Sequence, residues 1–345
     1  MRKPGRRDFL KVAGASAAAG RALGIEPART DGAPAGKTAS DPDDSGEKYP
    51  KLSMITPYSP AKLAFAAQVG YEGVVIPLDD FFDPDKLSDS QVDKVLATAR
   101  DARIRIISIE CMWGLNHIAK DPTERKNARA KFVRCLEFGH RLGCKFVGTF
   151  TGGAEGAKPD DQVKELAAAI NEDYLPVSEK LDMRFGPENY PCPVNFATVP
   201  ALWEKLFALV PNHRFGLEYD PSHFVRQYID PIQTAWNFRD RIHAVHAKDT
   251  EIIQPVLQKV GIHGEGWWRY RIPGQGLIDW PAFITVLLQV GFKGGIAVEH
   301  EDDFWDAQGW NEREDFPQAR KDGFILAHRF LSQFLPGRLA QGEML

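Results

Sequence analysis

Hydrophobic and polar positions follow two alternating rhythms from residue 51 onward. Short runs rich in aliphatic, β-branched and aromatic residues alternate with longer stretches in which apolar residues recur every three or four positions, the patterns of buried strands and amphipathic helices. Strands are predicted at residues 52–56, 73–78, 104–110, 146–151, 183–188, 215–220, 244–248 and 295–299. Helices are predicted at residues 61–69, 89–102, 123–142, 160–181, 199–210, 231–239, 280–290 and 316–334.

Strands separated by helices of this length indicate parallel βαβ units, because a parallel return needs a crossover connection. Eight such units predict an α/β fold, a single (β/α)8 TIM barrel over residues 51–340. A doubly wound sheet is the alternative, but it would need a glycine-rich phosphate loop after its first strand. Residues 55–59 (ITPYS) follow that strand instead, and Gly152 and Gly153 are too sparse to form such a loop.

The first 50 residues differ from the rest of the chain. Arg6 and Arg7 precede a weakly apolar run at residues 12–19, which is typical of a twin-arginine export signal. We expect a signal segment at residues 1–35, a flexible linker at residues 36–50 and a periplasmic or otherwise exported protein. A chance basic tail is the alternative, because Arg21 soon interrupts the apolar run.

Overall composition excludes several classes. The 43 Lys and Arg residues against 47 Asp and Glu residues give a net charge of −4, so no basic excess supports nucleic-acid binding. No run approaches the roughly 20 apolar residues of a membrane span. The four cysteines form no CxxC pair, which favours buried free thiols over a disulfide framework.

Four consecutive predicted strands end in a carboxylate or an imidazole, the face at which barrel enzymes carry their active sites. These residues are Glu188, Asp220, His246 and Glu299. An isolated carboxylate after a strand is usually a helix cap, but three of them beside a histidine would repel each other unless a cation lay among them. Oxygen and nitrogen ligands predict one divalent ion, Mn²⁺ or Mg²⁺ first, with Co²⁺, Fe²⁺ or Zn²⁺ as alternatives. Glu218 shares a strand face with Asp220, which is preferred because it lies nearer the mouth.

At these strand ends the chain resembles the xylose-isomerase-like TIM barrels of sugar isomerases and epimerases. The matching segments are residues 187–190 (PENY), 220–223 (DPSH), 246–249 (HAKD) and 298–301 (VEHE). The resemblance implies that the four strand-end residues bind the metal, that Glu188 and Glu299 form the acid/base pair, and that His223 hydrogen-bonds a substrate oxygen. Dimers are common in the family, so a homo-oligomer is a further expectation.

The chain departs from the family at Ile252, where epimerases carry a substrate-binding arginine. Arg269 or Arg271, in the long loop at residues 251–277, could replace that cation. Further candidates for the substrate pocket lie close to predicted strand ends: Glu110, Trp113, His117 and Lys248, with Tyr58 and residues 267–268 as aromatic candidates.

The constellation predicts a divalent-metal-dependent sugar isomerase or epimerase that moves a proton through an enediolate. A metal-dependent lyase or hydratase on keto-sugars or keto-glycosides is the alternative, because expulsion of a β leaving group needs the same residues. A non-catalytic periplasmic sugar-binding barrel is the alternative from another class. A related apurinic endonuclease is disfavoured, since it uses three zinc ions and more histidines than these strand ends supply. A small sugar or keto-sugar is the expected partner.

Overall fold

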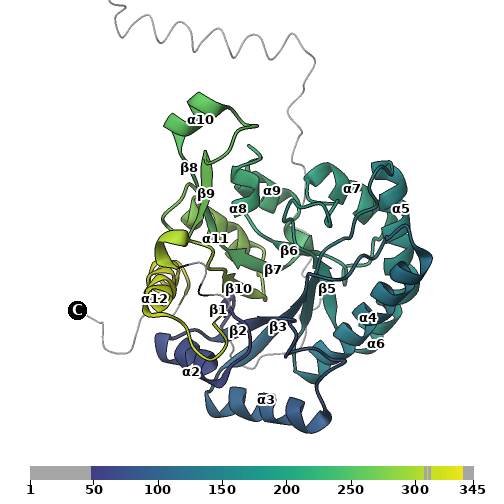
Figure 1. Cartoon of the computed structure of the whole chain (residues 1–345), viewed down its shortest axis with the longest axis horizontal. Helices are drawn as coiled ribbons and strands as arrows, with labels where there is room; N and C mark the ends of the chain where they lie inside the picture. The colour runs from purple at the N-terminus through teal and green to yellow at the C-terminus, as the bar shows by residue number, and fades with distance from the viewer. Residues whose placement is uncertain (1–47, 307–308, 310–311, 337–345) are drawn as a thin grey trace, which may run out of the picture. The chain divides into compact units, whose positions relative to one another are not determined.

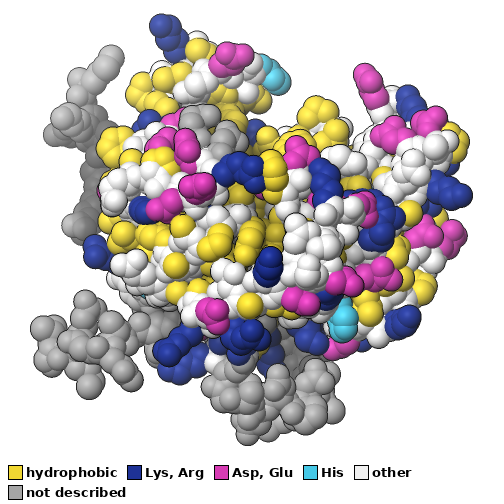
Figure 2. Space-filling model, turned by 60° about the horizontal axis from the view of Figure 1, so that its bottom comes forward, with side chains coloured by type: hydrophobic (Ala, Val, Ile, Leu, Met, Phe, Trp, Pro, Cys, Tyr) yellow, Lys and Arg dark blue, Asp and Glu magenta, His cyan; other side chains and the backbone are white. Residues whose placement is uncertain are grey.

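The structure is a computed structural model that describes residues 48–306, 309 and 312–336. The signal segment expected at residues 1–35, and all but the last three residues of the expected linker, lie outside the described residues. No helix within the described ranges is long and apolar enough to cross a membrane. Charged side chains of both signs are interspersed with apolar ones over the face shown in Figure 2.

Eight parallel strands form a barrel whose hydrogen-bonded order is β5-β4-β3-β2-β1-β10-β7-β6. They are β1 (Lys51–Ile55), β2 (Gly73–Pro77), β3 (Arg105–Cys111), β4 (Phe146–Thr149), β5 (Arg184–Pro187), β6 (Leu217–Tyr219), β7 (Ile242–Ala247) and β10 (Gly295–Val298). The isolated parallel bridges Phe185–Phe215 and Glu188–Glu218 join the two ends of the sheet. The predicted (β/α)8 barrel is therefore confirmed, and the doubly wound alternative is wrong.

Helices cover the outside of the barrel (Figure 1). The α-helices of the described residues are α2 (Pro60–Val69), α3 (Asp89–Asp101), α4 (Pro122–Arg141), α5 (Pro159–Ala169), α6 (Leu175–Lys180), α7 (Pro200–Leu209), α8 (Ser222–Val225), α9 (Pro231–Asn237), α10 (Gln254–Val260), α11 (Trp280–Gln289) and α12 (Gln318–Ser332). Several begin with proline beside a polar cap, as when Ser59 Oγ accepts from the Lys62 amide and Asp121 from the Thr123 and Glu124 amides. Side-chain oxygens thereby satisfy amide groups that a helix start leaves free.

Two predicted helices differ from the structure. The helix predicted at residues 160–181 is interrupted by a π-helical turn, Ile170–Tyr174, between α5 and α6. The helix predicted at residues 316–334 begins only at Gln318, because Pro317 is extended and serves as its N-cap. Neither difference moves a strand end, so the positions of the predicted site residues on the barrel are unaffected.

The stretch predicted as a long loop contains an antiparallel hairpin, β8 (Asp249–Ile252) paired with β9 (Trp268–Arg271), and α10 lies between the two strands. Figure 1 shows β8, β9 and α10 standing away from the barrel. Buried Asp249 anchors the base of the hairpin: its carboxylate accepts from the amides of Gly274 and Ile278 and from Trp280 Nε1. The base of the hairpin is therefore tied to the start of α11.

An extra residue in β3 sets the orientation of its end. Val74 pairs with Ile106 but Val75 pairs with Ser108, so Ile107 forms a bulge. The Ile107 side chain packs in a small cluster with Ile55, Val75 and Ala297. Bulges re-aim the residues that follow them, and β3 beyond the bulge brings Glu110 to His246, as described next.

Candidate active site and metal centre

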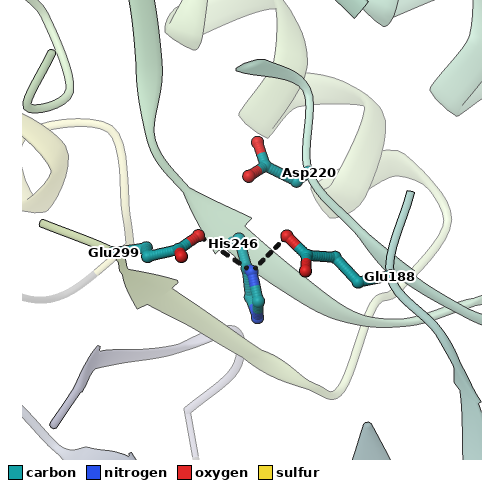
Figure 3. A group of neighbouring side chains, drawn as sticks. All are labelled: Glu188, Asp220, His246 and Glu299. Atoms are coloured by element: carbon teal, nitrogen blue, oxygen red, sulfur yellow. Dashed lines mark hydrogen bonds and ion pairs between the residues drawn. The ribbon is translucent and has the colours of Figure 1, made fainter. Parts of the chain in front are cut away.

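Glu188, Asp220, His246 and Glu299 converge at one point, and each offers a ligand atom within 4.8 Å of the others. They follow or lie in β5, β6, β7 and β10, the strands predicted to carry them. Figure 3 shows the Glu188 and Glu299 carboxylates on opposite sides of His246, with Asp220 nearby. His246 Nδ1 lies 3.1 Å from Glu188 Oε1 and 3.2 Å from Glu299 Oε2.

Two further carboxylates lie on the other side of the imidazole. His246 Nε2 is 3.0 Å from Glu110 Oε1 and 3.2 Å from Glu218 Oε1. Burial raises the pKa of Glu110 and raises that of Glu218 to about 8. Glycine at position 148 makes room for Glu218, because a Cβ there would lie 1.9 Å from Glu218 Oε2. His246 is thus held between carboxylates at both nitrogens, an arrangement that fixes the ring of a metal-binding histidine.

The sequence favoured Asp220 over Glu218 as the metal ligand from this strand. The structure buries both side chains in the site. The alternation of side chains along β6 could have identified Glu218 as a site residue, because it places residues 218 and 220 on the same side of the strand. Asp220 belongs to the four-residue cluster, and Glu218 belongs to a second group with Glu110 and His246.

Lys248 supplies a buried cation beside the cluster. Its ammonium is 2.7 Å from Glu299 Oε2, 2.8 Å from Glu301 Oε2 and 3.3 Å from Asp220 Oδ2, and it lies 4.5 Å from the centre of the Tyr270 ring. Burial alone would lower the pKa of Lys248, but the surrounding carboxylates outweigh it and hold the pKa well above its usual range. Lys248 is therefore charged at neutral pH.

His223 connects the cluster to the hairpin. Its Nε2 lies 3.1 Å from both Glu188 Oε1 and Asp220 Oδ2, and its Nδ1 is hydrogen-bonded to Tyr270 Oη at 2.9 Å. Sequence reasoning missed Tyr270 and Glu301. Tyr270 could not be found because the pairing of β8 with β9 that brings it to His223 was predicted as a loop.

The ionisation of two carboxylates of the cluster, Glu188 and Asp220, suits metal binding. Burial alone would raise the pKa of Asp220, but His223 and Lys248 outweigh it and lower the pKa to about 2. Burial likewise opposes ionisation of Glu188, yet His246 and His223 hold its pKa well below its usual range. Both carboxylates are therefore ionised at neutral pH, as metal ligands must be.

The donor atoms of the cluster also fit a divalent ion. Six carboxyl groups surround His246 and Lys248: Glu110, Glu188, Glu218, Asp220, Glu299 and Glu301. Glu218, whose pKa burial raises to about 8, is mostly protonated at neutral pH, whereas Glu188 and Asp220 are ionised. Carboxylate oxygens and one imidazole nitrogen are ligands that Mn²⁺, Mg²⁺ and related divalent ions accept. The residues present therefore fit one divalent ion held by Glu188, Asp220, His246 and Glu299.

A cavity of about 1650 Å³ opens over the cluster. Several predicted pocket residues line it, namely Glu110, Trp113, Lys248, Tyr58, Trp268 and Arg269. Trp267 does not, because it is buried against the Tyr228 ring.

Two other predicted pocket residues are placed elsewhere. His117 is buried behind β4, hydrogen-bonded to Tyr174 Oη at 2.7 Å and Thr149 Oγ1 at 2.9 Å, and burial lowers its pKa to about 3. The Arg271 guanidinium donates to Glu251, Asp302 and Gln275 and does not line the cavity. These partners hold the hairpin against the segment after β10, so Arg271 is not placed to replace the arginine missing at Ile252.

Comparisons with known proteins agree with this architecture. The family model described as a xylose isomerase-like TIM barrel matches residues 63–321. An inosose dehydratase of Geobacillus kaustophilus is 28% identical over 104 residues, 29% of this chain and 34% of that protein. The chain spans about a third of the length of the curated relatives it matches.

Solved structures share the fold at low sequence identity. A D-allulose 3-epimerase from Methylomonas sp. superposes with a TM-score of 0.62 at 15% identity, covering 84% of this chain and 100% of that one. A 3-keto-D-glucoside 4-epimerase from E. coli gives 0.61 at 15% identity, covering 81% and 100%.

Proposed function

Because the chain belongs to the xylose isomerase-like TIM-barrel family, we propose that it is a divalent-metal-dependent sugar isomerase or epimerase with Mn²⁺ as its ion. The observation that carries the proposal is the placement of the Glu188 and Glu299 carboxylates on opposite sides of His246 (Figure 3). Two bases facing one point from two sides can remove a proton from a carbon and return it on the other face.

Glu188, Asp220, His246 and Glu299 would hold the ion. When bound, a divalent ion supplies a Lewis acid that stabilises negative charge developing on a carbonyl oxygen. Glu188 and Glu299 take and return the proton at the adjacent carbon. His223, whose Nδ1 is hydrogen-bonded to Tyr270 Oη, orients Glu188 and Asp220 through its Nε2, and Lys248 compensates the charge of Glu299 and Glu301.

A dehydratase or other lyase is the second candidate, supported by the similarity to an inosose dehydratase. Proton removal beside a carbonyl is common to both reactions. A lyase then loses a leaving group from the next carbon, which needs an acid beside that group. The Lys248 ammonium, 2.8 Å from Glu301, lines the cavity beside the carboxylate cluster and is a charged hydrogen-bond donor there.

Incorporation of solvent deuterium tests the proposal. The Mn²⁺-loaded protein is incubated in D₂O with D-allulose, an inosose and phenyl 3-keto-D-glucoside, and the products are followed by NMR. We expect deuterium at the carbon beside the carbonyl of one probe, and loss of that signal by at least ~10²-fold in Glu299→Gln. Release of phenol or an unsaturated product would favour the lyase. Saturable binding without exchange or elimination would contradict both candidates and leave a sugar-binding protein.

A further inference from the structure

The cavity is larger than one sugar ring requires. Ligand pockets typically enclose about 300–1000 Å³ for a drug-sized molecule, whereas this cavity measures about 1650 Å³. One end lies at Glu188, His246 and Glu299, on β5, β7 and β10. The other end is lined by the loops after β1 and β2 and the first turns of α3.

The far end has an aromatic wall. Phe81, in the loop after β2, lines the cavity and leaves 57% of its surface exposed. The Arg313 guanidinium lies over its ring. Behind them Tyr58 stacks on Phe82 with ring centroids 5.7 Å apart. An exposed aromatic ring inside a cavity is suited to stacking against another ring with an apolar face.

Buried polar contacts hold this wall in place. The Lys62 ammonium, on a fully buried side chain, donates to the Glu312 carbonyl at 2.5 Å. Ser59 Oγ donates to the Glu314 carbonyl at 2.6 Å. These two bonds fix the backbone on either side of Arg313. A buried cation is costly unless it has hydrogen-bond partners. Because the buried Lys62 ammonium has the Glu312 carbonyl as a partner, the wall is formed before a ligand binds.

A second aromatic platform lies at the metal end. Trp113, after β3, is 69% exposed and lines the cavity. Its ring makes edge contacts with Phe150 at 5.2 Å and Tyr190 at 6.4 Å, and Tyr190 packs on His223 at 5.1 Å. Trp113 is thus grouped with the candidate metal centre through Tyr190 and His223, whereas Phe81 is grouped with Arg313.

From these two platforms we propose that the substrate is a keto-glycoside with two rings. The keto-sugar ring lies over Glu188 and Glu299 beside Trp113, and a second ring, joined through the glycosidic oxygen, stacks on Phe81. The inference rests on the function proposed above, because that function places the keto-sugar at the carboxylate cluster. It adds the class of substrate and the residue that selects it.

Equilibrium binding to a matched pair of probes tests the inference. Calorimetry on the Mn²⁺-loaded full chain compares 3-keto-D-glucose with phenyl 3-keto-D-glucoside, which differ by the second ring. We expect the glycoside to bind at least about tenfold more tightly. Phe81→Ala should weaken the glycoside by about three- to tenfold and leave 3-keto-D-glucose unchanged. Phe304→Ala is the control, because Phe304 is 72% exposed and does not line the cavity.

Equal affinity of the wild type for the two probes would overturn the inference. So would the failure of both probes to bind, or an equal loss of affinity for both probes in Phe81→Ala. Failure of the proposed function is distinguishable from these outcomes. A two-ring preference without deuterium exchange would overturn the isomerase, whereas exchange at equal affinity for the two probes would overturn the second subsite alone.

Discussion

The Lys248 ammonium lies 2.7 Å from Glu299 Oε2, so a buried cation pairs with one of the two carboxylates assigned to proton transfer. Its other neighbours, Glu301 and Asp220, are carboxylates as well. The side chain therefore keeps together negative charges that would otherwise repel one another. It does so from the side of the cluster that faces Tyr270.

Replacing this cation should destabilise the protein when no metal is bound. Removing one partner of a buried ion pair typically costs about 3–5 kcal/mol, so Lys248→Met should lower the free energy of unfolding by that amount in EDTA. Added Mn²⁺ should recover part of the loss, because it binds the folded state. Urea unfolding with and without Mn²⁺ measures both effects.

Lys86→Met provides the matched control. Lys86 pairs with Asp80 at 2.7 Å on an exposed surface, where solvent screens the ion pair and it contributes little to stability. Equal losses of stability in the two variants would show that Lys248 is not an essential counter-charge.

Glu218 should make stability depend on pH. Burial raises the pKa of Glu218 to about 8 from an ordinary value of 4.5, so the folded state binds a proton that the unfolded state releases between those values. The stabilisation is complete below pH 4.5 and is lost as pH rises toward 8, by up to about 1.4 kcal/mol per pH unit.

Glu218→Gln, which is neutral at every pH, should therefore match the wild type near pH 4.5 and be more stable at pH 8–9 in EDTA. Guanidinium unfolding across this pH range measures the difference. Parallel curves for the two proteins would contradict the burial of a protonated Glu218.

Tyr270 should act through His223. Tyr270→Phe removes the hydroxyl hydrogen-bonded to His223 Nδ1 at 2.9 Å. A hydrogen bond of this kind contributes about 0.5–1.5 kcal/mol, so we expect kcat/KM to fall about two- to tenfold on whichever probe shows turnover. Tyr228→Phe is the control, since Tyr228 is 60% exposed and stacks on Trp267 away from His223. An unchanged kcat/KM in Tyr270→Phe would remove Tyr270 from the site.

The parts of the fold and site that follow from short-range pattern were predictable from the sequence. Strand ends can be read from alternation and turn residues, and the barrel then brings Glu188, Asp220, His246 and Glu299 to one face. Even the weakly apolar strand predicted at residues 183–188 is present as β5, because its neighbours in the sheet determine its position.

Features that depend on long-range contacts were not predictable. His117 follows β3 as a pocket residue would, yet Tyr174 and Thr149 bind its ring from behind β4. Arg271 donates a hydrogen bond to Asp302, 31 residues away in the chain. The convergence of Glu110 and Glu218 on His246 Nε2 depends on the bulge at Ile107 and on the space left by Gly148, which no local pattern reveals.

The metal content of the protein tests most directly whether Glu188, Asp220, His246 and Glu299 bind one divalent ion. Elemental mass spectrometry of the purified protein should find about one divalent ion, Mn²⁺ first, for each chain. Asp220→Asn and His246→Ala should lose the ion while circular dichroism shows an intact fold, and His213→Ala, which changes an exposed histidine, should keep it. A wild-type protein that holds no metal and takes none up on titration, or an Asp220→Asn variant with a full complement, would contradict the assignment of these four residues as a metal centre.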